Sequence, residues 1–241
     1  MTSTSDHGTR AYYDDFSQGY ERERGRGYHA LLDDLEVDIT LPYARDARVL
    51  EVGCGTGLIL ERLAEVAQRA QGIDLSPGML ERARARGLDV VEGSATSIPF
   101  EDDAFDLTVS FKVLPHVPDV GRALSEMARV TRPGGHLVAE FYNPLSLRWL
   151  AKRIAGPRPI AEGRTEADVY TRWDTADAVR RMVPPGVELV DFRGVRVFTP
   201  AAFVHRVPWI AGALARAERR AVASPLRWLG GFLVAIMRKS E

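Results

Sequence analysis

The chain has 241 residues, 45% of them hydrophobic, and a formal net charge of −1 at pH 7. This length can bury a full core without disulfides or metals, which favours one globular domain. The single cysteine, Cys54, excludes an internal disulfide, the polar N-terminus lacks the apolar core of a signal peptide, and no apolar run is long enough to span a membrane. We therefore expect a cytoplasmic protein.

Charge is unevenly distributed along the chain. Residues 1–150 hold 16 Lys and Arg against 24 Asp and Glu, a balance of −8, whereas residues 151–241 hold 16 against 9, a balance of +7. The basic second part favours an anionic substrate or an anionic surface nearby, with solvated arginines as the alternative. The overall charge does not favour a nucleic-acid partner.

The first part of the chain alternates between predicted strands and helices. Residues 1–10 are expected to be disordered, and residues 11–35 to form one or two helices in a segment that Pro42 ends. Strands are predicted over 48–52, 70–74, 89–92, 107–111 and 136–141. Helices are predicted over 58–67, 76–86 and 120–130. This alternation predicts a parallel, doubly wound sheet.

After Pro144 the pattern loosens. Helices are predicted over 145–154, 175–182 and 200–223, and strands over 187–198 and 231–239. Residues 145–172 and 200–230 are expected to form the lid and substrate elements of a single domain, 1–241.

The most informative segment is the sequence EVGCGTG at residues 51–57. Its glycines, Gly53, Gly55 and Gly57, follow an apolar strand at alternate positions. Glycine tolerates positive φ and has no Cβ, so a ligand can lie against the backbone there. The dinucleotide fingerprint G-x-G-x-x-G has a different spacing. The turn predicts a nucleotide-type site at the carboxyl end of a strand.

This turn resembles motif I of the class I S-adenosylmethionine-dependent methyltransferases. Further motifs follow in that family's order: GIDLSPGML at 72–80, PF at 99–100, FDL at 105–107, HVPD at 116–119 and RPGG at 132–135. The likeness covers roughly residues 45 to 142 and is nearest to the small-molecule branch typified by quinone-biosynthesis methyltransferases. It implies an α/β fold with a doubly wound seven-stranded sheet of order 3-2-1-4-5-7-6, the last strand antiparallel. N-terminal helices and a C-terminal helical insertion would act as a lid.

The resemblance implies S-adenosylmethionine as cofactor. Glu51 would attract the ammonium group, with capping of a backbone amide as the alternative, and Asp74 would accept the ribose hydroxyls. Ser94 stands where many relatives have Asp, and its hydroxyl is a shorter, neutral acceptor for adenine. The expected cofactor residues are Tyr20, Glu51, Gly53, Cys54, Gly55, Gly57, Asp74, Leu75, Met79, Ser94, Ala95, Thr96 and Phe111. Ordinary packing is the alternative for Tyr20 and Met79.

His116 is the candidate catalytic base, because its pKa suits proton transfer near neutrality. A hydrogen bond within its loop is the alternative role. No metal site is predicted. Residues expected to orient the acceptor or line its pocket are Tyr142, Asn143, Tyr170, Trp173 and His205. Arg193 and Arg196 are expected on one strand face, where they would bind an acidic acceptor.

The predicted function is in-line transfer of a methyl group to an oxygen, nitrogen or carbon atom of a small-molecule acceptor. A partly apolar, anionic acceptor is favoured, with at most peripheral contact with a membrane. Two alternatives stay open: a methyltransferase of protein or RNA, and a non-catalytic module that binds S-adenosylmethionine. The sequence lacks the Asn/Asp-Pro-Pro motif of amino-methylating DNA enzymes, since Leu145 follows Asn143 and Pro144.

Overall fold

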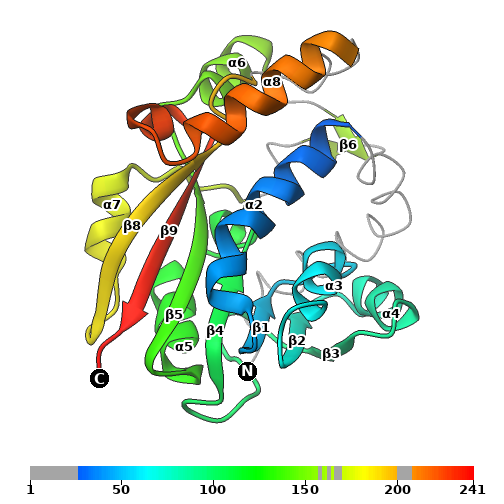
Figure 1. Cartoon of the computed structure of the whole chain (residues 1–241), viewed down its shortest axis with the longest axis vertical. Coiled ribbons are helices and arrows are strands. Elements are labelled where there is room, and N and C mark those ends of the chain that lie inside the picture. Colours follow the sequence, from blue (N-terminus) through cyan, green and yellow to red (C-terminus); the bar gives the residue numbers. More distant parts are fainter. Residues whose placement is uncertain (1–26, 157–158, 162–163, 166–169, 200–207) are drawn as a thin grey trace.

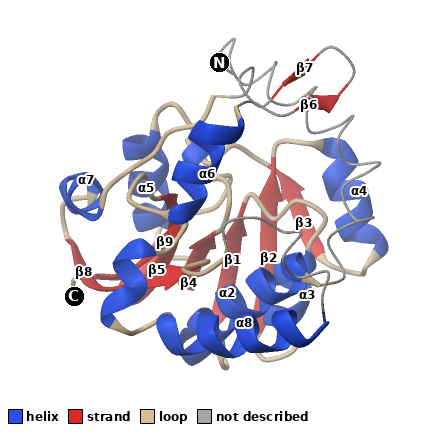
Figure 2. Ribbon diagram, turned by 90° about the horizontal axis from the view of Figure 1, so that it is seen from above, coloured by secondary structure: helices blue, strands red, loops and turns tan. Residues whose placement is uncertain are grey.

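The computed structural model describes residues 27–156, 159–161, 164–165, 170–199 and 208–241 (Figure 1). The expectations for residues 1–10, for Tyr20 and for His205 lie outside the described residues. Within the described ranges, helices cover both faces of one central sheet (Figure 2).

The sheet has seven strands in the order β3-β2-β1-β4-β5-β9-β8. Their bounds are β1 Arg48–Val52, β2 Arg69–Asp74, β3 Asp89–Glu92, β4 Phe105–Ser110, β5 Thr131–Tyr142, β8 Val187–Val195 and β9 Phe232–Lys239. Strands β1 to β5 pair in parallel, and β9 pairs antiparallel with both β5 and β8. The predicted doubly wound order, with the last strand antiparallel, is confirmed. A separate two-stranded pair joins β6 Pro159–Ala161 to β7 Arg164–Thr165.

Five of the described helices begin within two residues of the predicted starts, at residues 58, 77, 120, 147 and 176, whereas the first described helix runs on to residue 44 instead of ending at 35. The described helices are α2 Tyr28–Ala44, α3 Leu58–Ala64, α4 Pro77–Ala85, α5 Val120–Val130, α6 Leu147–Ala155, α7 Ala176–Met182 and α8 Pro208–Ala221, with 3-10 turns η1 Leu114–His116 and η4 Pro225–Leu229. Ser76 caps α4 by accepting a hydrogen bond from the Met79 amide. One expectation is wrong: Pro42 does not end the lead-in helix. It lies in the last turn of α2, which runs on to Ala44.

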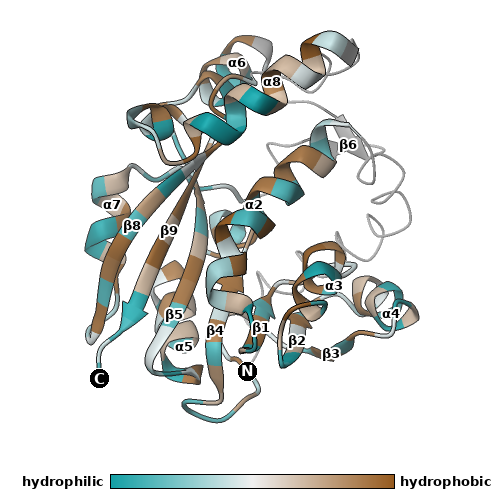
Figure 3. Ribbon diagram, in the orientation of Figure 1, coloured by the Kyte–Doolittle hydropathy of each residue, from teal (hydrophilic) through white to brown (hydrophobic). Residues whose placement is uncertain are grey.

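Two hydrophobic layers lie on opposite faces of the sheet. Helices α2, α3 and α8 contribute to the layer on one face, and α5 and α7 to the layer on the other. Figure 3 shows hydrophobic residues along the strands between these helices. Side chains alternate along β5, so that Val138 and Tyr142 face α2 whereas Leu137 and Phe141 face α5. By the same alternation Glu140 faces α2, which places a carboxyl group inside that layer.

The expectation that Arg193 and Arg196 share one strand face is wrong. They are three residues apart, which reverses the face in a strand, and β8 ends at Val195. Arg193 pairs with Asp191 in the same strand. Arg196 has a left-handed backbone, φ 63°, and its guanidinium lies over the ring of Tyr28 at 5.1 Å from the centroid.

Candidate functional site

The glycine turn after β1 has the left-handed backbone that its sequence predicts. Gly53, Gly55 and Gly57 have φ of 77°, 55° and 84°. A Cβ on Gly53 would lie 2.2 Å from a methyl carbon of Val113, whereas a Cβ on Gly55 would meet nothing within 4 Å. Glycine is therefore required at residue 53 for two reasons: a Cβ would overlap Val113, and the backbone is left-handed. The open side at Gly55 is where a ligand could approach the main chain.

Asp74 links this turn to the end of β2. Its Oδ2 accepts a hydrogen bond from the Gly55 amide at 2.9 Å, and its Oδ1 accepts one from the Ser76 amide at 2.9 Å. Asp74 thus shapes the turn and carries negative charge beside it.

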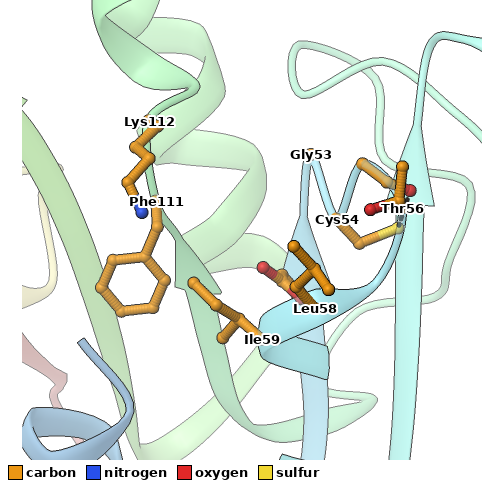
Figure 4. Close-up of a pocket in the computed structure, with 9 residues that line it drawn as sticks. Gly53, Cys54, Thr56, Leu58, Ile59, Phe111 and Lys112 are labelled. Carbon is orange, nitrogen blue, oxygen red and sulfur yellow. Dashed lines mark hydrogen bonds between the residues drawn. The ribbon is translucent and has the colours of Figure 1, made fainter. Parts of the chain in front are cut away.

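A pocket opens at the turn (Figure 4). It is lined by Glu51, Gly53, Cys54, Gly55, Thr56, Leu58, Ile59, Phe111 and Lys112. Five of these were expected from the sequence. Thr56, Leu58, Ile59 and Lys112 were missed, although each directly adjoins an expected residue or helix start.

Glu51 is the acidic residue that lines this pocket. It is 3% exposed, and its Oε2 has no hydrogen-bond partner within the described part of the chain. Burial raises the pKa of Glu51 well above its usual range, and nearby Glu36 and Asp33 raise it further while Lys112 lowers it. A buried carboxyl oxygen without a donor fits a site that receives an ammonium group.

The wall of the pocket continues into a buried cluster of charges. Lys112 Nζ lies 3.0 Å from Asp33 Oδ1 and 2.5 Å from Glu36 Oε2. The Lys112 backbone is left-handed, φ 61°, which turns the chain after β4 toward α2. Glu140 is fully buried, and burial together with the charge of Glu36 raises its pKa well above the usual range. The cluster ties α2 to the carboxyl edge of the sheet.

The thiol of Cys54 has a structural environment. Cys54 is 6% exposed, and its amide donates to the Ile73 carbonyl at 2.9 Å, as does the Gly53 amide at 2.8 Å. Burial, with the charges of Glu51 and Asp74, raises the pKa of the thiol. Because the thiolate is the reactive form, this environment disfavours nucleophilic chemistry.

Seven of the expected cofactor residues do not line this pocket. They are Gly57, Leu75, Met79, Ser94, Ala95 and Thr96, together with Asp74 itself. Met79 is 2% exposed and Ala95 is 8% exposed, so both offer little surface to a ligand. Ser94 Oγ lies 3.0 Å from Thr96 Oγ1, and the Thr96 carbonyl accepts a 2.6 Å hydrogen bond from Arg122. Their contacts with adenine stay predictions.

His116 lies in η1, after β4, with a defined tautomer. Its Nδ1 is 2.9 Å from the Tyr170 carbonyl, which can only accept, so Nδ1 carries the proton. The Nε2 lone pair then faces the Tyr142 hydroxyl at 3.4 Å. Burial lowers the pKa of His116, and the charges of Arg148 and Lys152 lower it further. The imidazole is therefore neutral at pH 7 and has the form that a base requires.

Tyr142 belongs to an aromatic cluster around one arginine. The guanidinium of Arg148 lies 4.1 Å from the ring centroid of Tyr142 and 4.8 Å from those of Trp173 and Phe232. These contacts bring Tyr142 and Trp173 together, and their role in binding an acceptor stays a prediction. Asn143 instead donates to the Trp228 and Gly230 carbonyls and is 1% exposed, so it holds the chain together.

The described residues were searched for metal-binding clusters and for helices that could span a membrane. No group of three or more His, Cys, Asp or Glu in that part of the chain could hold a metal ion. None of the helices described there is long and apolar enough to cross a membrane.

Comparisons with known proteins agree with this geometry. A family model for a methyltransferase domain matches residues 50–139. A demethylmenaquinone methyltransferase of Mycobacterium sp. (strain KMS) is 36% identical over 163 residues, which cover 61% of this chain and 70% of that protein. A demethylmenaquinone methyltransferase of Renibacterium salmoninarum is 45% identical over 101 residues, so that 40% of this chain matches 42% of the relative's length.

The fold also has close counterparts among solved structures. A Thermotoga maritima S-adenosylmethionine-dependent methyltransferase, described as a possible histamine N-methyltransferase, superposes with a TM-score of 0.68 at 20% identity, over 96% of this chain and 99% of the other. At that identity the likeness shows the fold alone. With the family model and the Mycobacterium relative, it leads to one conclusion: the chain belongs to the class I S-adenosylmethionine-dependent methyltransferase family.

Proposed function

We propose that this chain transfers a methyl group from S-adenosylmethionine to an oxygen, nitrogen or carbon atom of a small molecule. The observation that carries the proposal is the buried Glu51 carboxyl, whose Oε2 has no donor within the described residues, beside a turn that is open at Gly55. A cationic amino-acid group satisfies that carboxyl without a phosphate-binding fingerprint.

The cofactor site is assigned residue by residue. Glu51 would hold the ammonium group, the main chain around Gly55 would support the methionine part, and Asp74 would accept the ribose hydroxyls. Phe111 lines the same pocket and would lie near the sulfonium. When bound, S-adenosylmethionine supplies a methyl group on a positively charged sulfur, which is an excellent leaving group. The protein then has to align the acceptor and exclude water.

His116 would act as the base for a protonated acceptor. Its Nε2 would take the proton directly or through the Tyr142 hydroxyl, which lies 3.4 Å away. The Nδ1–H bond to the Tyr170 carbonyl would keep the ring oriented and stabilise the imidazolium that forms.

A small molecule is the favoured acceptor. The named relatives are demethylmenaquinone methyltransferases, and the two matches cover 40% and 61% of this chain. The aromatic cluster around Tyr142 and Trp173 would provide an apolar surface next to the proposed base. These features support a partly apolar acceptor.

Transfer of a labelled methyl group tests this proposal. Purified chain is incubated with labelled S-adenosylmethionine and separate sets of phenols, quinols, amines and carboxylic acids. Label in a small-molecule product supports the proposal. Label only in added protein or RNA would identify a macromolecular methyltransferase instead. Saturable binding of the cofactor with no transfer to any class would favour the non-catalytic alternative.

A further inference from the structure

Helix α6 leaves a row of apolar side chains outside the packed core. Leu147, Leu150 and Ile154 are 48%, 50% and 78% exposed. Because residues three, four and seven positions apart share one side of an α-helix, these three side chains form a single stripe. Leu145, just before the helix, is 64% exposed and adds to this apolar surface. We call these four side chains the α6 face.

The α6 face belongs to a segment without acidic residues. No Asp or Glu occurs in residues 141–161, whereas α6 itself carries Arg148, Lys152 and Arg153. Arg153 is exposed and comes three residues after Leu150, so it lies beside the apolar stripe. An apolar surface with cations beside it is complementary to a partner that is apolar and negatively charged.

A second basic helix lies at the same end of the molecule. Figure 1 shows α6 and α8 together at the top of the view, and α6 follows the carboxyl end of β5 in the chain. Trp209 of α8 is 75% exposed. Arg216 and Arg220 come seven and eleven positions later on the same side of α8 and are also exposed. Arg219 instead forms ion pairs with α2. Exposed tryptophan among cations is typical of the interface between water and lipid.

We propose that the α6 face, together with the exposed cations of α8, docks this chain on an anionic phospholipid membrane. Helices with an apolar side and cationic flanks bind such a surface, because the apolar side chains enter the headgroup boundary while the cations attract the lipid phosphates. A second copy of this chain fits less well. In a two-fold contact the same cations would face each other and repel.

Docking through this helix would hold the proposed acceptor region near the bilayer. Arg148, on the buried side of α6, lies over the ring of Tyr142 at 4.1 Å from its centroid. The Tyr142 hydroxyl lies 3.4 Å from Nε2 of His116. The same helix therefore presents the α6 face to solvent and contacts the residue beside the proposed base. This consequence rests on the proposed function, whereas the docking itself does not.

Flotation of the full chain with lipid vesicles tests the docking. The vesicles contain equal parts of phosphatidylglycerol and phosphatidylcholine, and vesicles of phosphatidylcholine alone are the uncharged control. We expect partition onto the anionic vesicles to exceed partition onto the control by at least about tenfold, since several exposed cations contribute. Partition should fall as salt is added, because salt screens exposed charges.

Variants of the α6 face identify the surface that binds. Leu150→Glu and Ile154→Glu should each lower partition onto the anionic vesicles by about tenfold or more, since an acid replaces an apolar side chain. Arg153→Gln should lower it by about fivefold. Val190→Glu is the matched control, because Val190 is 52% exposed but belongs to strand β8. It should bind like the unmodified chain.

Three results would overturn the proposal: no partition onto the anionic vesicles, equal partition onto both kinds of vesicle, or equal loss in Val190→Glu and in the α6 variants. Light scattering measures the mass of the same proteins in solution. A dimer that Leu150→Glu dissociates would assign the α6 face to a second copy instead. Thermal unfolding is a further check, since a clearly lowered melting temperature in both α6 variants would show that these side chains hold the fold.

The flotation is run without cofactor, so its outcome is independent of the proposed function. A chain that floats with the vesicles but does not bind S-adenosylhomocysteine would keep the docking surface and refute the proposed function. A chain that binds S-adenosylhomocysteine but does not float would do the reverse.

Discussion

The Gly55 amide donates a 2.9 Å hydrogen bond to Oδ2 of Asp74, which joins the glycine turn to the end of the neighbouring strand. This bond makes one carboxylate serve both the shape of the cofactor turn and its proposed contact with ribose. Substitution of Asp74 should therefore affect cofactor binding more than a lost ligand contact alone.

For Asp74→Asn we expect the dissociation constant of S-adenosylhomocysteine to rise by about 100-fold, since two charge-assisted acceptor contacts are weakened. Isothermal titration measures the change. Asp89→Asn is the control, because Asp89 begins β3 at the surface and bonds only to Arg69 and Gln71 among the contacts described. Unchanged affinity in Asp74→Asn would remove Asp74 from the site.

Glu51→Gln should separate ligand binding from stability. The variant loses the charge that would pair with the ammonium group, so we expect affinity to fall by about tenfold or more while the melting temperature is kept. In the wild type an arriving ammonium lowers the raised pKa of Glu51, so binding releases a proton and strengthens as pH rises. Titration in buffers with different heats of ionisation counts that proton. Binding without proton release, at equal affinity in the variant, would contradict this role.

Glu140→Gln should change how stability depends on pH. The folded pKa of Glu140 is raised above the unfolded value of about 4.3. Protonated Glu140 therefore contributes its full share to the free energy of unfolding below about pH 4.3, and this share is lost as the pH rises toward the folded pKa. The variant should thus be about 1–3 kcal/mol more stable than wild type at pH 8, with little difference near pH 4. Urea unfolding at both pH values measures this. The exposed Glu188→Gln is the control, and a less stable Glu140→Gln at pH 8 would show that the charged cluster holds the fold.

His116→Asn should reduce turnover about 100-fold or more and leave S-adenosylhomocysteine affinity unchanged, because a positioned base contributes on this scale. Burial lowers the pKa of His116, so the base is lost only below about pH 6.5 in the wild type, and the acid limb of the rate profile should lie there. That limb should be absent in the variant. His136→Asn is the control, since His136 is partly buried, has a lowered pKa and stacks on Tyr43. If the pH–rate profile of His116→Asn kept its acid limb, His116 would not be the base and would instead only hold its loop in place.

Gly53→Ala and Gly87→Ala form a matched pair for the glycine turn. Both positions have left-handed backbones, φ 77° and 80°, but only Gly53 has a close neighbour, Val113 at 2.2 Å. Gly87→Ala should cost about 1 kcal/mol from backbone strain alone, and Gly53→Ala clearly more. Adding Val113→Ala should recover part of the difference, as chemical denaturation would measure. If both alanine substitutions lowered the free energy of unfolding equally, the side chain of Val113 would be able to move away from residue 53 without loss of stability.

Local patterns in the sequence identified most of the fold. Strands β1 to β5 all overlap the predicted strand segments, and Ser76 and Gly87 mark the ends of α4, so these elements were predictable from nearby residues. The sheet order came from resemblance to a family, because pairing between distant strands leaves no local pattern. Proline often marks the end of a helix, yet the last turn of α2 accommodates Pro42.

The buried charges were the part that the sequence did not reveal. Glu140 lies in an apolar strand and meets Glu36 from a helix about a hundred residues earlier, so only the folded sheet brings them together. Lys112 and Arg148 look like ordinary surface residues after a strand and at a helix start. Gly231, which lets Arg148 and Arg196 approach, is the last residue before β9, where no motif marks it.

The most direct test is calorimetric titration of the unmodified chain with S-adenosylhomocysteine, repeated in the presence of NAD⁺. The account predicts saturable binding at one site per chain, unaffected by NAD⁺ and strongly weakened in Asp74→Asn. Absence of saturable binding, or displacement of the ligand by NAD⁺, would contradict it.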